Sequence, residues 1–326
     1  MAEFHYGGQA LIEGVMIRGR SHLAIAVRRP DGTIHLLTQP LGKLVTGRLR
    51  QLPLTRGVVV LGETLALGMK ALLYSAQIAL GEEEGQEFPQ GLAWGTVAFA
   101  LVIGVGLFFV LPLLLARLLS PLASSPLANN LLEGALRLVI FVLYLKVVGL
   151  FGEIRRVFAY HGAEHQVVNA YESGRPLELE AVRDRPTAHT RCGTSFILVV
   201  LVVAVLVFSL LGKPPLWLGI IERILLIPVI AVVSYELLQW SARHYRNGLV
   251  RALFRPGLLL QGLTTRPPDE GMREVALTAL KGALEADSSA LRAGTPPGGA
   301  LRAAEAPGGI GPEAESQGGR ASSPGG

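Results

Sequence analysis

The sequence predicts an α-helical integral membrane protein with about four transmembrane helices, a small N-terminal β-containing cytoplasmic module and a cytoplasmic, histidine-rich helix-loop insertion. Three observations carry this prediction. Of the 326 residues, 50% are hydrophobic and only 17% are charged, which is too apolar for a soluble protein of this size. Long uncharged runs recur between residues 92 and 238. One polar stretch, residues 158–195, interrupts them and holds three histidines and the single cysteine.

Residues 1–55 are expected to form the β-containing module. Two apolar runs, 23–27 and 33–37, flank a Pro30-Asp31-Gly32 turn, which is typical of a β-hairpin. The first ten residues lack the basic and apolar regions of a cleavable signal peptide. Glu13 and Arg18 lie among several glycines and are candidate site residues, although turns in a small sheet are the commoner reason for such glycines.

Residues 56–90 are expected to hold an amphipathic helix and an acidic connector. The helix covers about residues 56–80, and Glu63 and Lys70 interrupt its apolar pattern, so we expect it to lie on the membrane or against other helices. The segment 91–151 then contains two predicted spans, 92–116 and 131–151. Arg137 and Lys146 lie inside the second span. The helix is expected to continue past it and carry the histidines on a rigid stalk that ends at Gly174.

The polar segment 152–193 separates these spans from two more in the segment 194–242, at residues 194–211 and 216–238. The last span carries Glu222, Arg223 and Glu236, and ionisable groups in such a position tend to be kept for pairing or function. A C-terminal segment, 243–285, is expected to end in a helix from about residue 269. The Gly-, Ala-, Pro- and Ser-rich residues 286–326 are expected to be a disordered tail.

The distribution of cations predicts which side of the membrane each connector occupies. The connectors 117–133 and 212–215 hold only Arg117 and Lys213 as cations. Arginines are concentrated between the second and third predicted spans and after the fourth, at positions 155, 156, 175, 183, 185, 191, 243, 246, 251 and 255. By the positive-inside rule, both termini and the histidine segment are therefore expected to be cytoplasmic.

His161, Glu164 and His165 form an H-x-x-E-H pattern. On a helix the two histidines project one turn apart from one face, where both imidazoles can bind one zinc ion, and the glutamate is left free to accept a proton from water. A helix beside a membrane also carries His and Glu simply as a solvated face, and that alternative stays open.

Further ligands for this ion come from other parts of the sequence. His189 and Cys192 follow the motif, although a lone intracellular thiol is more often a small buried hydrophobe than a ligand. H-x-x-E-H sites often add a distant carboxylate. Glu236 lies near the cytoplasmic end of the fourth predicted span, with Ser234 and Tyr235 beside it as secondary candidates, whereas Glu222 is about 20 Å too far towards the other face. Glu236 has an alternative role as the partner of an arginine such as Arg243.

Four sequence blocks resemble the YqhQ-like family of uncharacterised bacterial membrane proteins, described as predicted metal-dependent enzymes. The blocks are GGQALIEGVMIRG (7–19), YHGAEH (160–165), RCGTS (191–195) and PGLLLQGLTTR (256–266). They cover essentially the whole chain apart from the tail, and the resemblance implies a multi-pass protein of the bacterial cytoplasmic membrane. Arg191 belongs to the third block. This chain has Thr190 where the family-like stretch His-Pro-Arg-Cys-Gly has proline, while the candidate ligands remain.

Two functions from different classes remain open at the sequence level. The first is a membrane-embedded metal-dependent hydrolase with Glu164 as general base and a divalent metal, most simply Zn²⁺, on His161, His165 and a third ligand. Its substrate would be a membrane-protein segment or a lipid headgroup. The second is a non-enzymatic membrane scaffold or assembly factor with a structural metal on His161, His165, His189 and Cys192. The lipid bilayer is the expected partner in both, and no nucleic acid is expected.

Overall fold

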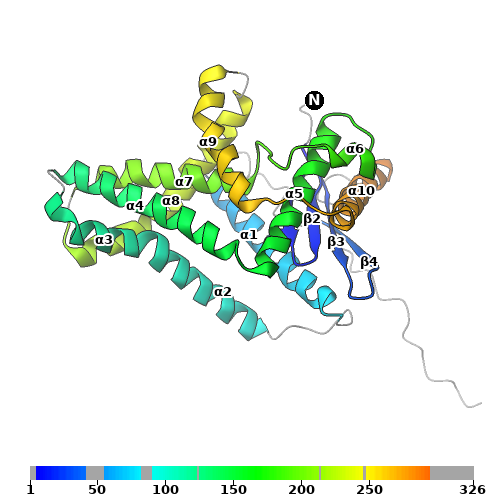
Figure 1. Cartoon of the computed structure of the whole chain (residues 1–326), viewed down its shortest axis with the longest axis horizontal. Coiled ribbons are helices and arrows are strands. Elements are labelled where there is room, and N and C mark those ends of the chain that lie inside the picture. The colour runs from blue at the N-terminus through cyan, green and yellow to red at the C-terminus, as the bar shows by residue number, and fades with distance from the viewer. Residues whose placement is uncertain are drawn as a thin grey trace, which may run out of the picture.

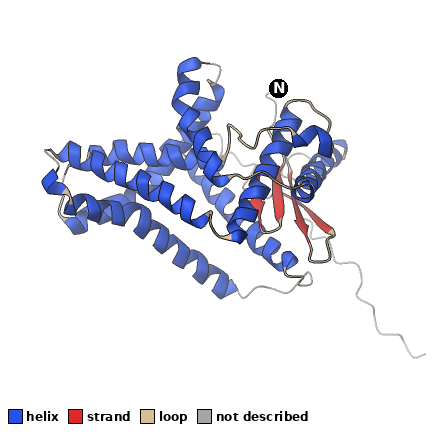
Figure 2. Cartoon of the chain, in the orientation of Figure 1, coloured by secondary structure: helices blue, strands red, loops and turns tan. Residues whose placement is uncertain are grey.

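The helices and strands form an elongated bundle with an α/β body at one end (Figure 1). The computed structural model describes residues 5–41, 55–81, 90–122, 125–212, 214–244 and 247–293. Within these residues the chain is mostly helical, and its strands are confined to the α/β body (Figure 2). The polar parts of the chain therefore gather at one end of the apolar helices.

The N-terminal module is a four-stranded antiparallel sheet in the order β1-β2-β3-β4. Its strands are β1 (Gly7–Leu11), β2 (Gly14–Arg18), β3 (His22–Arg28) and β4 (Ile34–Pro40). The predicted hairpin is confirmed as β3–β4, with Ile25 opposite Leu37. The glycine-rich block forms a second hairpin, β1–β2, whose turn holds Glu13 at a positive φ of 51°. A non-glycine residue is strained there, so its carboxylate needs tertiary contacts to hold it.

Both faces of this sheet are buried. On β3, Leu23, Ile25 and Val27 point to one face, which is covered by α1 (Thr55–Ala79). Ala24 and Ala26 point to the other face, which is covered by α5 (Gly152–Glu172) and α10 (Glu270–Arg292). The alternation follows from the period of two along a strand. A short helix, α6 (Leu179–Arg183), completes the body.

Helix α1 confirms the predicted helix over residues 56–80 and joins the body to the bundle. Ala71 and Ile78 in its second half pack on the sheet. In its first half, a Cβ on Gly57 would lie 3.2 Å from Val232 of α8, so the two helices approach closely. Arg18 of β2 also donates a 3.2 Å hydrogen bond to Glu63 of α1. The α1 segment Val59–Ala79 is itself long and apolar enough to cross a membrane.

The four predicted spans are all helical in the bundle, but only those at residues 92–116 and 216–238 lie in helices that are candidate spans on their own. Its helices are α2 (Gln90–Val105), the π-helical turn η3 (Gly106–Val110), α3 (Leu111–Leu118), α4 (Pro126–Val148), α7 (Gly193–Ser209) and α8 (Leu216–Arg243), with a short 3₁₀ turn, η4 (Ser120–Leu122). Besides α1, the segments Gly95–Leu118 and Leu216–Ser241 are long and apolar enough to cross a membrane. Helix α4 is long and apolar enough only if it is counted together with α5 as one bent span. Helix α7 is apolar, but with 17 residues it is shorter than a full span. Three or four candidate spans therefore make this a membrane protein.

Two of the cations noted in the spans share one carboxylate inside the bundle. The Glu133 carboxylate accepts a 2.6 Å hydrogen bond from Arg137, one turn along α4, and a second 2.6 Å hydrogen bond from Arg223 of α8. Arg137 also donates to the Phe108 carbonyl, 2.8 Å away in the π-helical turn η3. All three charged side chains are almost fully buried. Charges within apolar helices are tolerated in this way because each has a partner.

The expected rigid stalk is wrong. Helix α4 ends at Val148, and α5 begins at Gly152 with its axis bent by 102°. The break falls in the sequence Gly149-Leu150-Phe151-Gly152, where Phe151 takes an extended conformation as the residue before α5. The histidine helix therefore crosses the end of the bundle and packs on the sheet, where its apolar face is covered.

The expected start of the tail at residue 286 is also wrong, because α10 continues to Arg292. Asp287 is buried and accepts hydrogen bonds from the backbone N–H groups of Arg20, Ser21 and His22 and from the Tyr6 hydroxyl. This contact with the sheet stabilises a final turn that composition alone does not predict. The rest of the expected tail, from residue 294, lies outside the described residues.

Candidate metal centre

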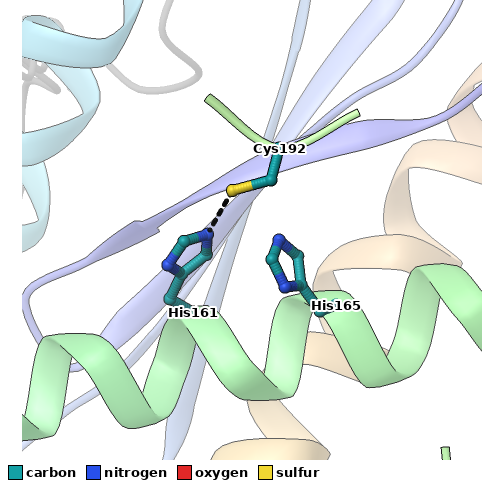
Figure 3. A group of neighbouring side chains, drawn as sticks. All are labelled: His161, His165 and Cys192. Carbon is teal, nitrogen blue, oxygen red and sulfur yellow. Dashed lines mark hydrogen bonds between the residues drawn. The ribbon is translucent and has the colours of Figure 1, made fainter. Parts of the chain in front are cut away.

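Helix α5 presents the two motif histidines side by side. His161 and His165 point from one face of the helix towards the loop that precedes α7 (Figure 3), and their ring centroids are 4.4 Å apart. This is the geometry that the four-residue spacing predicts. His165 is buried, and His161 is partly exposed.

Each histidine has its Nδ1 atom on a backbone carbonyl. His161 Nδ1 lies 2.9 Å from the Thr264 oxygen, and His165 Nδ1 lies 2.6 Å from the Thr187 oxygen. A carbonyl only accepts hydrogen bonds, so these contacts assign the proton to Nδ1 and leave Nε2 without a proton in both rings. Metal-binding histidines in proteins are commonly oriented in this way.

Cys192 supplies a third ligand atom. Its Sγ lies 3.2 Å from His161 Nε2 (Figure 3). Cys192 is also the N-cap of α7, where its sulfur accepts a 3.4 Å hydrogen bond from the Thr194 N–H. Of the two roles that the sequence leaves open for Cys192, ligand or small buried hydrophobe, these surroundings favour the ligand.

The three ligand atoms have a spacing that suits a transition metal. One ligand atom from each of His161, His165 and Cys192 lies within 4.8 Å of the other two. In a tetrahedral zinc site, bonds of about 2.0–2.3 Å put neighbouring ligand atoms roughly 3.2–3.8 Å apart. The upper limit of 4.8 Å is about 1 Å beyond that range, so the side chains would move by about that much on binding an ion. Two imidazoles and a thiolate are also the ligand types that zinc prefers.

Glu164 is buried against the same histidines. Its Oε2 lies 3.6 Å from His165 Nε2, and the Gly8 N–H of β1 donates a hydrogen bond to the carboxylate. Burial raises the pKa of Glu164 above its ordinary value, and the nearby histidines and the Gly8 N–H oppose that rise. A Cβ on Gly8 would lie 3.0 Å from Glu164 Cγ and 2.3 Å from the Met16 oxygen, so glycine is needed for the strand to approach the helix.

His189 contacts the carboxylate of Glu172, whereas the sequence suggests it as a ligand of the shared metal ion. Its Nε2 lies 3.2 Å from Glu172 Oε2 at the end of α5, and Arg191 also donates to the Glu172 carboxylate. The His189 ring centroid is 5.7 Å from that of His165. Burial lowers the pKa of His189, with Glu164 opposing the change. His189 thus lies beside the group of three ligands and outside it.

The remaining candidates lie apart from this group. Glu236 is in α8 and is not one of the three grouped ligands, while the neighbouring Ser234 hydroxyl donates to the Ile230 carbonyl. Glu13 accepts two hydrogen bonds from Arg156 and one from Tyr160, so it holds the strained β1–β2 turn against α5. Arg18 joins β2 to α1, as described above. These contacts give Glu13 and Arg18 structural roles.

Two residues that hold the site are not singled out by the sequence. Gln261 of α9 (Gly248–Thr264) is fully buried. Its side chain accepts from the His189 N–H and donates to the His189 carbonyl and the Ser195 hydroxyl, with all three distances between 2.8 and 2.9 Å. Thr264, at the end of α9, supplies the carbonyl for His161. The detectable signal is a lone uncharged polar residue in the apolar run LLLQGL.

The four sequence blocks that carry the family resemblance thus meet at this centre. Each block supplies one residue that contacts another member of the site. The first block supplies Gly8, which contacts Glu164, and the other three supply His161, Cys192 and Thr264, which contact one another through His161. Gly162 makes one of these approaches possible, because a Cβ there would lie 2.2 Å from the Arg266 oxygen.

Comparisons with known proteins agree with this resemblance. Residues 52–286 match the family described as "Protein of unknown function (DUF1385)". The chain is 34% identical over 298 residues to "Uncharacterized protein YqhQ" of Bacillus subtilis (strain 168), covering 87% of this chain and 93% of the relative. No solved structure matches the chain. The chain therefore belongs to the DUF1385 family and is a relative of the YqhQ protein.

Proposed function

We propose that this protein is a membrane-bound, metal-dependent hydrolase whose divalent cation, most simply Zn²⁺, is held by His161, His165 and Cys192. The observation that carries the proposal is the orientation of the two imidazoles. Both Nδ1 atoms are held by backbone carbonyls, and one ligand atom from each of the three residues lies within 4.8 Å of the other two. This arrangement supports metal binding more specifically than the short motif does.

Three protein ligands leave one position of a tetrahedral ion open, as in catalytic zinc sites. A bound zinc ion lowers the pKa of water and polarises a carbonyl or phosphoryl oxygen. Glu164 is placed to act as general base because its carboxylate lies beside His165 in a buried environment. Burial raises the pKa of Glu164 above its ordinary value, while the charges of His161 and His189 and the Gly8 N–H oppose that rise.

The substrate class is limited by where the site lies. Cys192 immediately precedes the apolar helix α7, and α5 crosses the end of the bundle. A carbonyl or phosphoryl group presented at the membrane surface, in a lipid headgroup or in a segment of a membrane protein, suits this placement. The cytoplasmic side, predicted from the arginine distribution, remains part of the proposal.

Metal analysis of detergent-purified protein tests the proposal. We expect about one zinc per chain in the wild type and a loss of most of it in His161→Ala and in Cys192→Ser. His244→Ala is the matched control, because His244 is exposed at the end of α8, and it should keep the metal. Metal contents that are equal in all four proteins would refute the assigned ligands.

The Glu164→Gln variant tests whether Glu164 acts as a general base or as a metal ligand. The variant should keep the metal, because the carboxylate is outside the group of three, and should lose the cellular function that the wild-type gene restores to a deletion strain. Loss of the metal in Glu164→Gln would make Glu164 a ligand and contradict its role as base.

The second candidate function is a non-enzymatic scaffold with a structural metal site, and the observation that supports it is the position of His189 beside the three ligands. With ring centroids 5.7 Å apart, His189 could join His165 on the metal if it left Glu172. His189→Ala distinguishes the two candidates. A structural four-ligand site should lose zinc affinity in His189→Ala, and it should bind zinc as well or better in Glu172→Ala, which removes the carboxylate partner of His189. An open three-ligand site should be insensitive to His189→Ala.

A further inference from the structure

Helix α9 has one buried face and, in its first half, two different exposed sides. Val250, Gly257, Gln261 and Thr264 are buried and face the protein. Leu249 and Leu253, one turn apart, are 78% and 71% exposed. Arg251 and Arg255, also one turn apart, are exposed as well. At about 100° per residue, the arginine pair lies roughly 200° around the helix from the leucine pair, so the exposed surface has an apolar side and a basic side.

The apolar side continues the surface of the apolar bundle. Further along α9, Leu260 and Leu263 pack against the cluster formed by Phe141 and Leu145 of α4 and Leu201 of α7. On the helix these leucines lie within about 80° of Leu249 and Leu253. The exposed leucines therefore point to the side of α9 on which the candidate spans lie, and the arginines point away from it.

The first half of α9 extends beyond both parts of the molecule. It leaves the junction between bundle and α/β body and runs across the long direction of the bundle (Figure 1). If the bundle crosses a bilayer, a helix in this direction runs along the membrane surface. Exposed leucines towards the hydrocarbon and arginines towards the headgroups are the features of an interfacial helix.

We infer that the segment Gly248–Pro256 of α9 is an interfacial helix that lies in the headgroup layer of an anionic bilayer, with Leu249 and Leu253 inserted and Arg251 and Arg255 on lipid phosphates. The leucines would otherwise expose a continuous apolar surface to water. The charge is complementary, since residues 248–264 contain two arginines and no acidic residue.

This assignment also sets the depth of the metal centre. The Thr264 carbonyl at the end of the same helix is 2.9 Å from His161 Nδ1. A helix fixed in the headgroup layer therefore holds one ligand of the centre at the membrane surface. The inference about α9 does not require a metal, so it stands or fails separately from the proposed function.

Fluorescence quenching in nanodiscs of mixed phosphatidylcholine and phosphatidylglycerol tests the inference. A dansyl-bearing amino acid replaces Leu253 in one protein and Arg251 in the matched control, with Cys192 left intact in both. Lipids labelled with a nitroxide near the headgroup should quench position 253 several-fold more than position 251. Iodide in the buffer should show the reverse preference.

Two outcomes would overturn the inference. One is iodide quenching at position 253 as strong as at position 251, because an inserted leucine position is shielded from water. The other is no change at position 253 when Arg251 and Arg255 are both replaced by glutamate in the same anionic discs, because headgroup attraction would then play no part. With the inference correct, these replacements should increase iodide quenching at position 253 at least two-fold.

Discussion

At the residue scale, the proposed centre depends on backbone carbonyls that orient side chains. His161 and His165 each use one nitrogen to bind a carbonyl, which leaves the other nitrogen for a metal. Glu164 lies on the side of the same helix that faces the sheet, and its carboxylate accepts a hydrogen bond from the Gly8 N–H. The motif predicts the spacing of these three residues, but their partners come from segments more than twenty residues away and could not be predicted from it.

Asp287 offers a test of how single buried carboxylates hold the body together. Burial raises its pKa, but hydrogen bonds from Ser21, Arg20 and Tyr6 outweigh this and lower the pKa below its usual value. Asp287→Asn should therefore destabilise the protein by about 2–4 kcal/mol at pH 7. The measurement is thermal unfolding in detergent. Glu285→Gln, on the exposed side of the same helix, should change little.

The pH dependence has a definite sign. Because the pKa of Asp287 is lower in the folded state, its stabilisation is present above the unfolded pKa of about 3.9 and is lost as the pH falls through the folded value. The difference between wild type and Asp287→Asn should shrink below pH ~4. A difference that stays constant down to pH ~3 would contradict the ionised role.

At the scale of elements, the close approach between α5 and the residues around the end of α9 brings the Thr264 carbonyl to His161. Gly162→Ala should push this segment away, because the new Cβ would lie 2.2 Å from the Arg266 oxygen. We expect zinc affinity to fall by about ten-fold or more, the range seen when such supporting contacts are lost. Gly152→Ala, in the same helix with nothing within 4 Å of the new Cβ, is the control. Equal affinities in the two variants would show that the Thr264 carbonyl does not support the centre.

The ion triad of Glu133, Arg137 and Arg223 is the corresponding feature of the bundle. Removing its one negative charge with Glu133→Gln leaves both arginines buried without a counter-ion, which should cost about 3–5 kcal/mol. Thermal unfolding in detergent is the measurement. An unfolding temperature that is unchanged by Glu133→Gln would mean that another group neutralises the arginines.

A triple variant tests the same triad from the other side. Glu133→Leu combined with Arg137→Met and Arg223→Met replaces every charge by an apolar side chain, so no buried charge is left without a partner. This variant should recover most of the stability that Glu133→Gln loses, because a buried ion group is often replaceable by well-packed apolar residues.

At the scale of the whole molecule, the arrangement makes the topology testable. The loop after α5 and the turn before α4 lie at opposite ends of α4 and α5 in the chain, and both Arg175 and Ser125 are exposed. In a Cys192→Ser background, Arg175→Cys should react with a membrane-impermeant thiol reagent only after cell lysis, whereas Ser125→Cys should react in intact cells. The reverse pattern would place the centre outside the cytoplasm.

Much of the architecture could be predicted from the sequence, for physical reasons that also explain the misses. Long apolar runs predict spans, and the Pro30-Asp31-Gly32 turn predicts the β3–β4 hairpin because both signals are local. The 102° bend between α4 and α5 was missed, because the apolar pattern of residues 131–151 does not show that α5 packs on a sheet built from the first 40 residues. The last turns of α10 could not be predicted for the same reason, because Asp287 is held by hydrogen bonds from Arg20 and Ser21 near the other end of the chain.

X-ray absorption at the zinc edge, on purified protein loaded with one equivalent of Zn²⁺, tests the central claim most directly. We expect one sulfur at about 2.3 Å and two imidazole nitrogens at about 2.0 Å, completed by one oxygen, with the sulfur lost in Cys192→Ser. A zinc environment that contains no sulfur, or that keeps its sulfur in Cys192→Ser, would contradict a metal centre built from His161, His165 and Cys192.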